Sequence, residues 1–93
     1  MKFSFKGVDG YLEPRIYKNG RKALVFVDMS GRIILPCSVN LPNEPLDEDE
    51  ILIKNYSENQ GMLDALVDAG VVRFDGVCVD TGYINLSKCK LIW

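Results

Sequence analysis

The sequence contains no histidine, and this absence excludes a large group of catalytic arrangements. Histidine is the most common general base near neutral pH and the most common protein ligand of transition metals. Nucleophiles of the Ser-His and Cys-His type therefore cannot be built within this chain. No glycine-rich phosphate-binding loop with its Lys-Ser/Thr occurs either. We expect a protein that is not an enzyme and that has no catalytic residues and no cofactor.

Cysteine is scarce, and the three that occur are far apart: Cys37, Cys78 and Cys89. No Cys-x-x-Cys pair is present, which disfavours a structural zinc site. Each cysteine lies in an apolar, strand-like run, as buried free thiols of a reducing compartment do. The chain also lacks a long apolar run and a signal-peptide pattern. We therefore predict a cytoplasmic protein with no metal site and no membrane contact.

The 93 residues, of which 47% are hydrophobic, are enough for one domain with its own core, and we assign residues 1–93 to it. Charge is unevenly distributed along this domain. Residues 1–43 hold seven basic and three acidic residues, a net of +4, whereas residues 44–93 hold four basic and ten acidic, a net of −6. The overall charge of −2 lacks the positive excess of a strong nucleic-acid binder and disfavours direct nucleic-acid binding.

The segment from Ile51 to Gly70 contains the one convincing helix, predicted at about residues 58–69. Ser57 and Gln60 have the spacing of a capping box, which predicts Ser57 as the N-cap. Gly70 predicts the left-handed residue that ends the helix. Apolar side chains recur on one helical face, which we expect to be buried against a sheet: Met62, Leu63, Leu66 and Val67.

Alternating and apolar runs before the helix predict a β-meander of antiparallel strands: Lys2–Lys6, Tyr11–Tyr17, Lys22–Asp28 and Arg32–Leu41. Asn19-Gly20 predicts a hairpin with a type I′ turn between the second and third of these. Pro14 cannot donate to a ladder, so its strand should have a free side.

Strand patterns also follow the helix. Val71–Phe74 and Val77–Val79 flank Asp75-Gly76, which predicts a second hairpin. The last strand, Tyr83–Trp93, has a one-residue slip in its apolar pattern that predicts a bulge near Ser87. The predicted fold class is α+β, with an antiparallel β-meander, one helix packed on the sheet and C-terminal strands completing it.

Two neighbouring segments are candidates for a binding surface. Asn55, Tyr56, Glu58 and Asn59 lie at the strand-to-helix junction, where free amides and the helix dipole can receive an anion or a carboxylate. Local helix capping is the alternative role for these residues. The acidic loop 42–50 precedes them and contributes three further candidates: Asp47, Glu48 and Asp49. A solvated loop is the alternative there, and calcium is disfavoured because the loop lacks the EF-hand ligand spacing and glycine.

The segment from Val39 to Val72 resembles a family of small proteins, a domain of unknown function, carried by phages and integrative elements of Gram-positive gut bacteria. Its most specific part is KNYSENQGML, from Lys54 to Leu63. The family has no assigned activity and no established catalytic residues, so the resemblance implies a mobile genetic element as the context.

Together these features favour a non-enzymatic binding protein that contacts a host or element protein. The first hypothesis is an inhibitor or adaptor of a host defence protein, of the anti-CRISPR or anti-restriction type. The second is a small-molecule or nucleotide-sequestering protein that uses the helix N-terminus. The third is a structural or accessory subunit of phage or conjugative machinery. A homodimer is also possible from the sequence, because unpaired strand edges can pair with a second copy.

Overall fold

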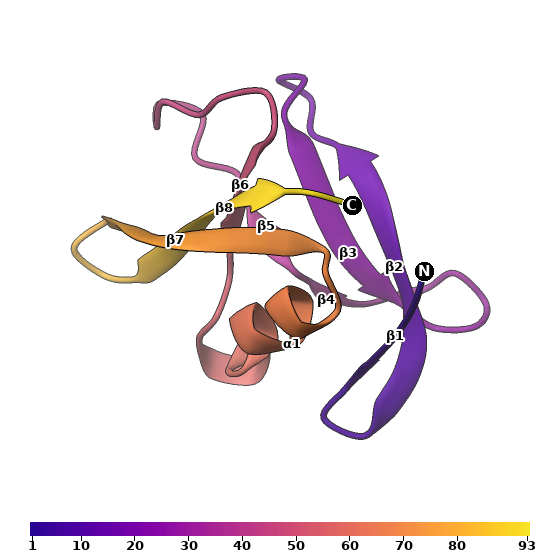
Figure 1. The fold of residues 1–93 in the computed structure, drawn as a ribbon. Helices are drawn as coiled ribbons and strands as arrows, with labels where there is room; N and C mark the ends of the chain where they lie inside the picture. The colour runs from indigo at the N-terminus through magenta and orange to yellow at the C-terminus, as the bar shows by residue number, and fades with distance from the viewer.

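The chain forms two four-stranded antiparallel sheets and one short α-helix, which confirms the predicted α+β class (Figure 1). The structure is a computed structural model and describes residues 1–93. The N-terminal sheet is the predicted meander, because its strands pair in chain order. They are β1 (Lys2–Phe5), β2 (Val8–Ile16), β3 (Lys22–Val27) and β4 (Ile33–Pro36).

The hairpin between β2 and β3 forms at Asn19-Gly20 as predicted, but its turn is not of type I′. A type I′ turn needs positive φ at both central residues. Gly20 has a φ of 85°, but Asn19 does not have a positive φ, because Lys6 and Ser57 are the only non-glycine residues that do. The amide of Tyr17 donates to the carbonyl of Arg21 at 2.8 Å, which leaves three residues in the loop. Such a loop needs one left-handed residue rather than two, and the glycine provides it.

Pro14 lies where β2 has no neighbour on one side, as its missing donor predicts. β1 begins at Lys2 opposite Tyr11, and the pairing extends one residue further, where the amide of Leu12 donates to the carbonyl of Met1 at 2.9 Å. Backbone groups of alternate residues in an antiparallel strand face the same side. The nitrogen of Pro14 therefore faces the unpaired edge beyond β1, where it offers no donor to an added strand.

Cys37 carries the chain from one sheet to the other. Its amide donates to the carbonyl of Leu24 in β3 at 2.9 Å, and its carbonyl accepts from the amide of Lys54 at 3.0 Å. The proline before it has no amide and ends β4. The strand predicted over Arg32–Leu41 is interrupted after Pro36, a residue that favours an edge or a bulge, and it divides into β4 and β5 (Ser38–Val39).

The C-terminal sheet brings together strands from both sides of the helix, in the order β5, β6, β8, β7. Every neighbouring pair is antiparallel. β6 lies between β5 and β8, so the strand that leads into the helix is an inner strand. The bounds of the three longer strands are β6 (Glu50–Ile53), β7 (Val72–Asp80) and β8 (Asn85–Leu91).

The hairpin predicted at Asp75-Gly76 is wrong, because β7 continues through this pair. Phe74 pairs with Cys89 on one side of it and Cys78 pairs with Ser87 on the other, with a register shift between them. The glycine has a φ of 88°, which suits a bulge in the edge strand. The bulge predicted in the last strand near Ser87 is therefore located on its partner β7.

The predicted helix is present in two parts. A 3₁₀ turn, η1 (Ser57–Asn59), is followed by Gly61 with a φ of 95°, and α1 (Met62–Asp68) begins after it. The buried face of α1 is the predicted one, although Val67 remains 41% exposed. No helix in the structure is long and apolar enough to cross a membrane.

The end of α1 agrees with the sequence prediction. Gly70 has a φ of 72°, and its amide donates to the carbonyl of Val67 at 3.0 Å. The amide of Val71 donates to the carbonyl of Leu66, also at 3.0 Å. This pair of bonds is the Schellman motif, which a glycine at this position allows at little cost.

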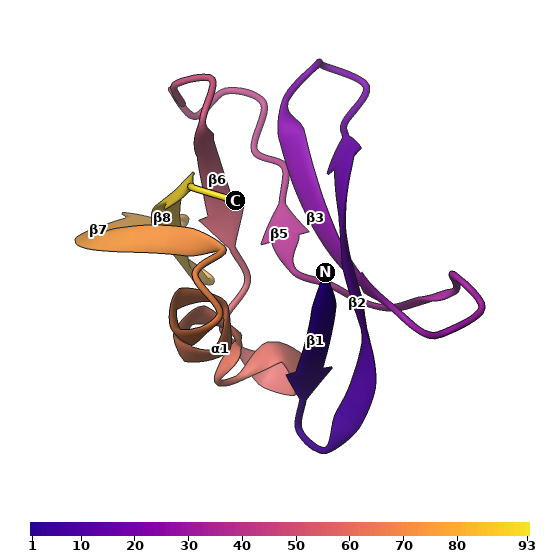
Figure 2. The same cartoon turned by 45° about the vertical axis from the view of Figure 1, so that its right-hand side comes forward.

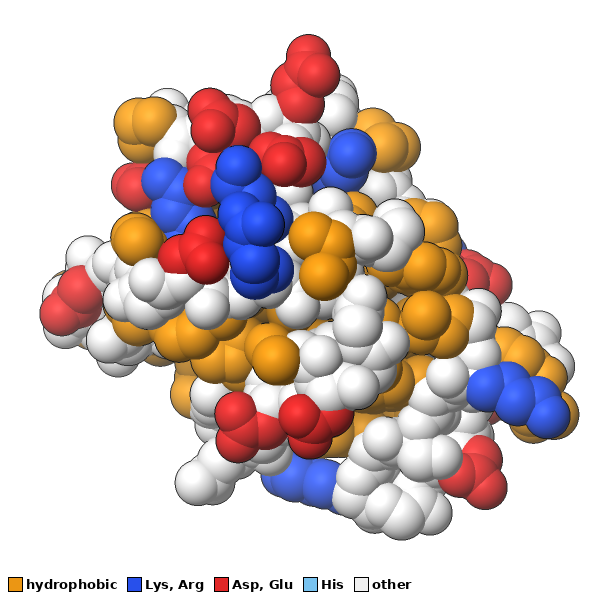
Figure 3. Space-filling model, viewed as in Figure 1, with side chains coloured by type: hydrophobic (Ala, Val, Ile, Leu, Met, Phe, Trp, Pro, Cys, Tyr) orange, Lys and Arg blue, Asp and Glu red, His pale blue; other side chains and the backbone are white.

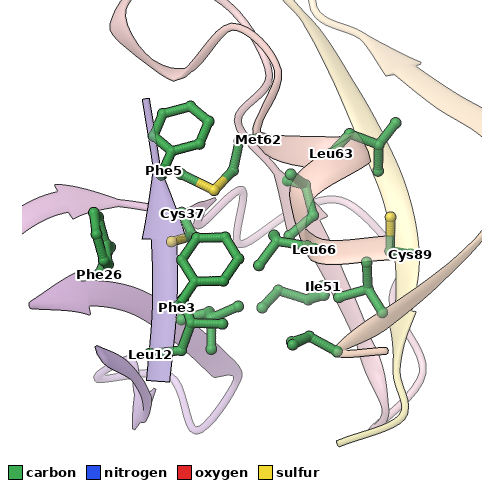
Figure 4. Close-up of a cluster of buried hydrophobic side chains, with 14 residues drawn as sticks. Phe3, Phe5, Leu12, Phe26, Cys37, Ile51, Met62, Leu63, Leu66 and Cys89 are labelled. Carbon is green, nitrogen blue, oxygen red and sulfur yellow. The ribbon is translucent and has the colours of Figure 1, made fainter. Parts of the chain in front are cut away.

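The core lies between the two sheets, and α1 fills the space at one end of it (Figure 2). Phe3 and Phe26 meet edge to face, with ring centroids 5.5 Å apart. Figure 4 shows phenylalanine side chains of the N-terminal sheet facing Met62 and Leu66 of the helix. The edge strands β1 and β7 do not pair with each other, so the two sheets do not join into one closed sheet.

Candidate binding groove beside the strand-to-helix junction

The junction between β6 and α1 is organised by Asn55. Its side-chain oxygen accepts a hydrogen bond from the backbone amide of Leu63 at 2.9 Å. This contact occupies one of the free amides of the first helical turn, the role that an N-cap side chain usually fills. Ser57 does not cap α1, since it lies in η1 with a φ of 57° and Gly61 stands at the N-cap. The capping box predicted for Ser57 and Gln60 is therefore wrong.

A small charged cluster covers the outside of the junction. The ammonium of Lys54 forms an ion pair with the exposed carboxylate of Glu58 and lies 5.3 Å from the ring centroid of Tyr56. Lys6 reaches across from the β1–β2 turn and donates to the backbone carbonyl of Glu58 at 3.3 Å. The hydrogen bond from Lys54, followed by backbone and Ser57 hydrogen bonds, lowers the pKa of Glu58 to about 2. Glu58 is thus ionised and already neutralised by a neighbour at neutral pH.

Asn59 does not belong to the surface on which the sequence placed it. Its side chain is fully buried, and its amide nitrogen donates to the carbonyl of Pro36 at 2.7 Å. The side-chain oxygen has no hydrogen-bond partner. Asn59 therefore ties η1 to the end of β4 and is not available to a partner.

The acidic loop lies at the opposite end of β6 from the junction (Figure 2). Four strand residues separate the two, a length of about 13 Å. Asp47 and Glu48 are exposed, while Asp49 lies 3.8 Å from Lys90. The two predicted candidate segments therefore do not form one surface.

Two of the five acidic residues of the loop, Asp49 and Glu50, lie near lysines of β8. Figure 3 shows acidic and basic side chains interspersed over the β7–β8 face. Glu50 lies 3.8 Å from Lys88, and Arg73 lies 3.3 Å from Asp75. No three acidic or cysteine side chains converge as metal ligands would.

Asn55 and Tyr56 instead line a groove at their own end of the C-terminal sheet, where Ile53 of β6 pairs with Ser87 of β8. This junction groove has a volume of about 460 Å³. It is completed by residues of β7, β8 and the turn between them: Cys78, Tyr83, Ile84, Asn85 and Ser87. Sequence reasoning missed these five, because the turn comes after a strand that was predicted to be two. An aromatic residue in the Thr81-Gly82-Tyr83 turn was the available signal.

Hydrogen bonds order the backbone of the turn between β7 and β8, which carries Tyr83. The hydroxyl of Thr81 accepts from the amides of Tyr83 and Ile84 at 3.4 and 3.2 Å. The carboxylate of Asp80 accepts from the amide of Gly82 at 2.8 Å. Tyr83 is nevertheless 97% exposed, so its ring is presented to solvent on a turn that is already ordered.

The groove offers aromatic rings, amides and hydroxyls, and none of its lining residues is charged. Such a set can form hydrogen bonds and cover apolar surface, but it provides no carboxylate or imidazole to move a proton. Cys78 is exposed, which corrects the prediction that all three thiols are buried. Burial raises the pKa of Cys37 and of Cys89 to about 12, so both are neutral thiols at physiological pH.

No protein-family model, curated protein or solved structure matches this chain.

Proposed function

We propose that this protein is a non-catalytic binding protein that acts by protein–protein contact, and that the junction groove is its contact surface. The observation that carries the proposal is the 97% exposure of Tyr83 beside the groove. Tyrosine is among the residues most enriched at interface hot spots, because its ring covers apolar surface while its hydroxyl forms a hydrogen bond.

Two further features support this surface. The Thr81 and Asp80 hydrogen bonds order the turn in advance, which lowers the entropic cost of binding. The lining side chains are uncharged, so a partner can cover them without stripping water from an unpaired charge. The partner surface that fits is one with an apolar centre and neutral hydrogen-bonding groups.

The resemblance to proteins of phages and integrative elements supports a host defence protein as the partner, of the restriction or CRISPR type. Inhibition would then follow from occupying a surface of the defence protein. The exposed Tyr83 and the neutral groove fit such a role, and they give no support to nucleotide binding at the helix. α1 has only seven residues, and its Leu63 amide is already bonded to Asn55.

The test is phage plating on bacteria that carry a defined restriction or CRISPR system and express the protein. Wild-type protein should raise plating on one such strain and leave plating on the undefended strain unchanged. Tyr83→Ser should lower the protection roughly tenfold or more, as loss of a hot-spot residue does. Met29→Ser is the matched control, since Met29 is 74% exposed in the β3–β4 turn, outside the groove.

Co-elution of the purified protein with the defence protein gives the direct readout. Complex formation should be lost with Tyr83→Ser and kept with Met29→Ser. Lack of protection in every defended strain, or equal protection by Tyr83→Ser, would contradict the proposal.

A further inference from the structure

A second hollow lies between the two sheets at the end of the core opposite α1. It has a volume of about 380 Å³ and is lined by Pro14, Arg15, Ile16, Lys22, Leu91 and Trp93. We call it the inter-sheet mouth. The end of β2 and the start of β3 form one wall, and the residues at and after the end of β8 form the other. Figure 2 shows the C-terminal segment lying in this gap.

The walls of the mouth are mainly apolar and reach solvent. Ile16 is 68% exposed and Trp93 is 44% exposed, although they stand at the edge of a close-packed core. Leu91 packs against that core, so the mouth continues from it. Hydrophobic side chains are visible at the surface in Figure 3 around the position that Figure 1 gives to the C-terminus. Apolar surface of this kind gains free energy when a ligand covers it.

Of the two basic side chains at the mouth, one has no acidic partner. Arg15 is paired with Glu13 at 2.8 Å, whereas Lys22 takes part in none of the five ion pairs and in no side-chain hydrogen bond. No acidic residue lines the hollow. A free ammonium beside an apolar hollow is complementary to a ligand with an anionic head and a hydrocarbon body.

The size of the mouth suits a small ligand, and Pro14 makes the β2 edge a poor site for an added strand. β2 exposes its edge here, but Pro14 places no donor on that edge. A volume of about 380 Å³ is within the range of small-molecule sites, which begins at roughly 300 Å³. A ligand that enters between the walls needs no backbone ladder.

We propose that the inter-sheet mouth binds a small amphipathic carboxylate of the fatty-acid class. Its hydrocarbon body covers Ile16 and Trp93, and its carboxylate contacts the ammonium of Lys22. This site is separate from the junction groove, with which it shares no lining residue.

Trp93 makes the test direct, because it is the only tryptophan in the chain. The purified protein is titrated with decanoate below its micelle concentration while tryptophan fluorescence is recorded. A saturable blue shift is expected as the ring leaves water. Decyltrimethylammonium, with the same chain length and the opposite charge, should bind at least about tenfold more weakly, which is the effect of one charge-assisted contact.

Two variants locate the site. Lys22→Glu should weaken decanoate binding about tenfold or more and remove the preference for the anion. Lys18→Glu is the matched control, because it makes the same charge change on the same hairpin outside the hollow. Ile16→Asp should also weaken binding, and its high exposure leaves the fold intact. Circular dichroism and urea unfolding verify folding of each variant.

The absence of a saturable change, an equal response to both detergent-like probes, or unchanged binding by Lys22→Glu would each overturn the proposal. A second copy of the chain is the competing occupant. If sedimentation shows a dimer that Ile16→Asp dissociates, the mouth is an interface and the ligand proposal fails. Lys22→Glu leaves the junction groove unchanged, so it should protect phage as well as the wild type does even though it loses decanoate binding. This result separates the ligand proposal from the proposed function.

Discussion

The side-chain oxygen of Asn55 accepts a hydrogen bond from the backbone amide of Leu63, eight residues later, at 2.9 Å. The bond joins the end of β6 to the first turn of α1 and spans the 3₁₀ turn between them. Because Gly61 at the N-cap has no side chain, Asn55 is the residue that satisfies this amide.

Replacing this cap should destabilise the protein. Asn55→Ala is expected to lower the free energy of unfolding by about 1 kcal/mol, as loss of an N-cap side chain does. Asn55→Asp should retain most of the stability, because a carboxylate also accepts from the amide. Urea unfolding followed by circular dichroism gives the measurement. Asn43→Ala in the exposed acidic loop is the control, and an equal loss in both alanine variants would contradict the capping role.

The strands could be predicted where burial alternates within a local segment. The N-terminal meander followed from the runs around Phe3, Leu12 and Phe26, each of which is buried. The path at Asp75-Gly76 could not be predicted in this way, since the pair suits a hairpin and a bulge equally well. Pairing with β8, which comes later in the chain, decides between them.

The helix start was missed for a related reason. Ser57 and Gln60 fit a capping box locally, but Asn59 is drawn into the interior by the carbonyl of Pro36 at 2.7 Å. That contact places η1 against β4, and the left-handed Gly61 redirects the chain into α1. Local spacing contains no information about a partner 23 residues away. Asn55 and Tyr56 of the candidate site were predicted, whereas the β7–β8 side of the groove depended on the missed pairing.

Gly10 should be the glycine least tolerant of a side chain. A Cβ atom there would lie 2.2 Å from the backbone carbonyl oxygen of Val27 and 2.9 Å from the ring of Phe26. Gly10→Ala must therefore push β2 away from β3, at a cost of about 3 kcal/mol. Gly7→Ala is the control, because that position has open space and suffers only from its φ of 79°, about 1 kcal/mol. Equal urea midpoints for the two variants would show that β2 is not packed this closely.

The three thiols should differ sharply in reactivity. Cys78 is exposed, whereas Cys37 and Cys89 are buried and their pKa values are raised to about 12 by that burial. A chromogenic disulfide reagent at neutral pH should modify one thiol quickly in the folded protein and all three in urea, since the thiolate is the reactive form. Cys78→Ser should abolish the fast reaction. Fast modification of Cys37 or Cys89 in that variant would contradict their burial.

Glu58 should make stability depend on pH in the acid range. Its pKa falls from an ordinary value of 4.5 to about 2, mainly through the hydrogen bond from Lys54. A carboxyl with a lowered pKa in the folded state stabilises the protein above the unfolded pKa, and this stabilisation is lost as pH falls through the folded pKa. The window is therefore between pH 4.5 and about pH 2.

Urea midpoints of wild type and Glu58→Gln should differ at pH 7 and converge as the pH approaches 2. The difference should shrink in high salt, because Glu58 is exposed and its interaction with Lys54 is screened. Asp28, whose pKa is also lowered, contributes equally to both proteins and cancels in the comparison. In a Lys54→Met background the Glu58→Gln change should lose most of its effect. A difference that stays constant from neutral to acid pH would mean that the carboxylate charge does not stabilise the junction.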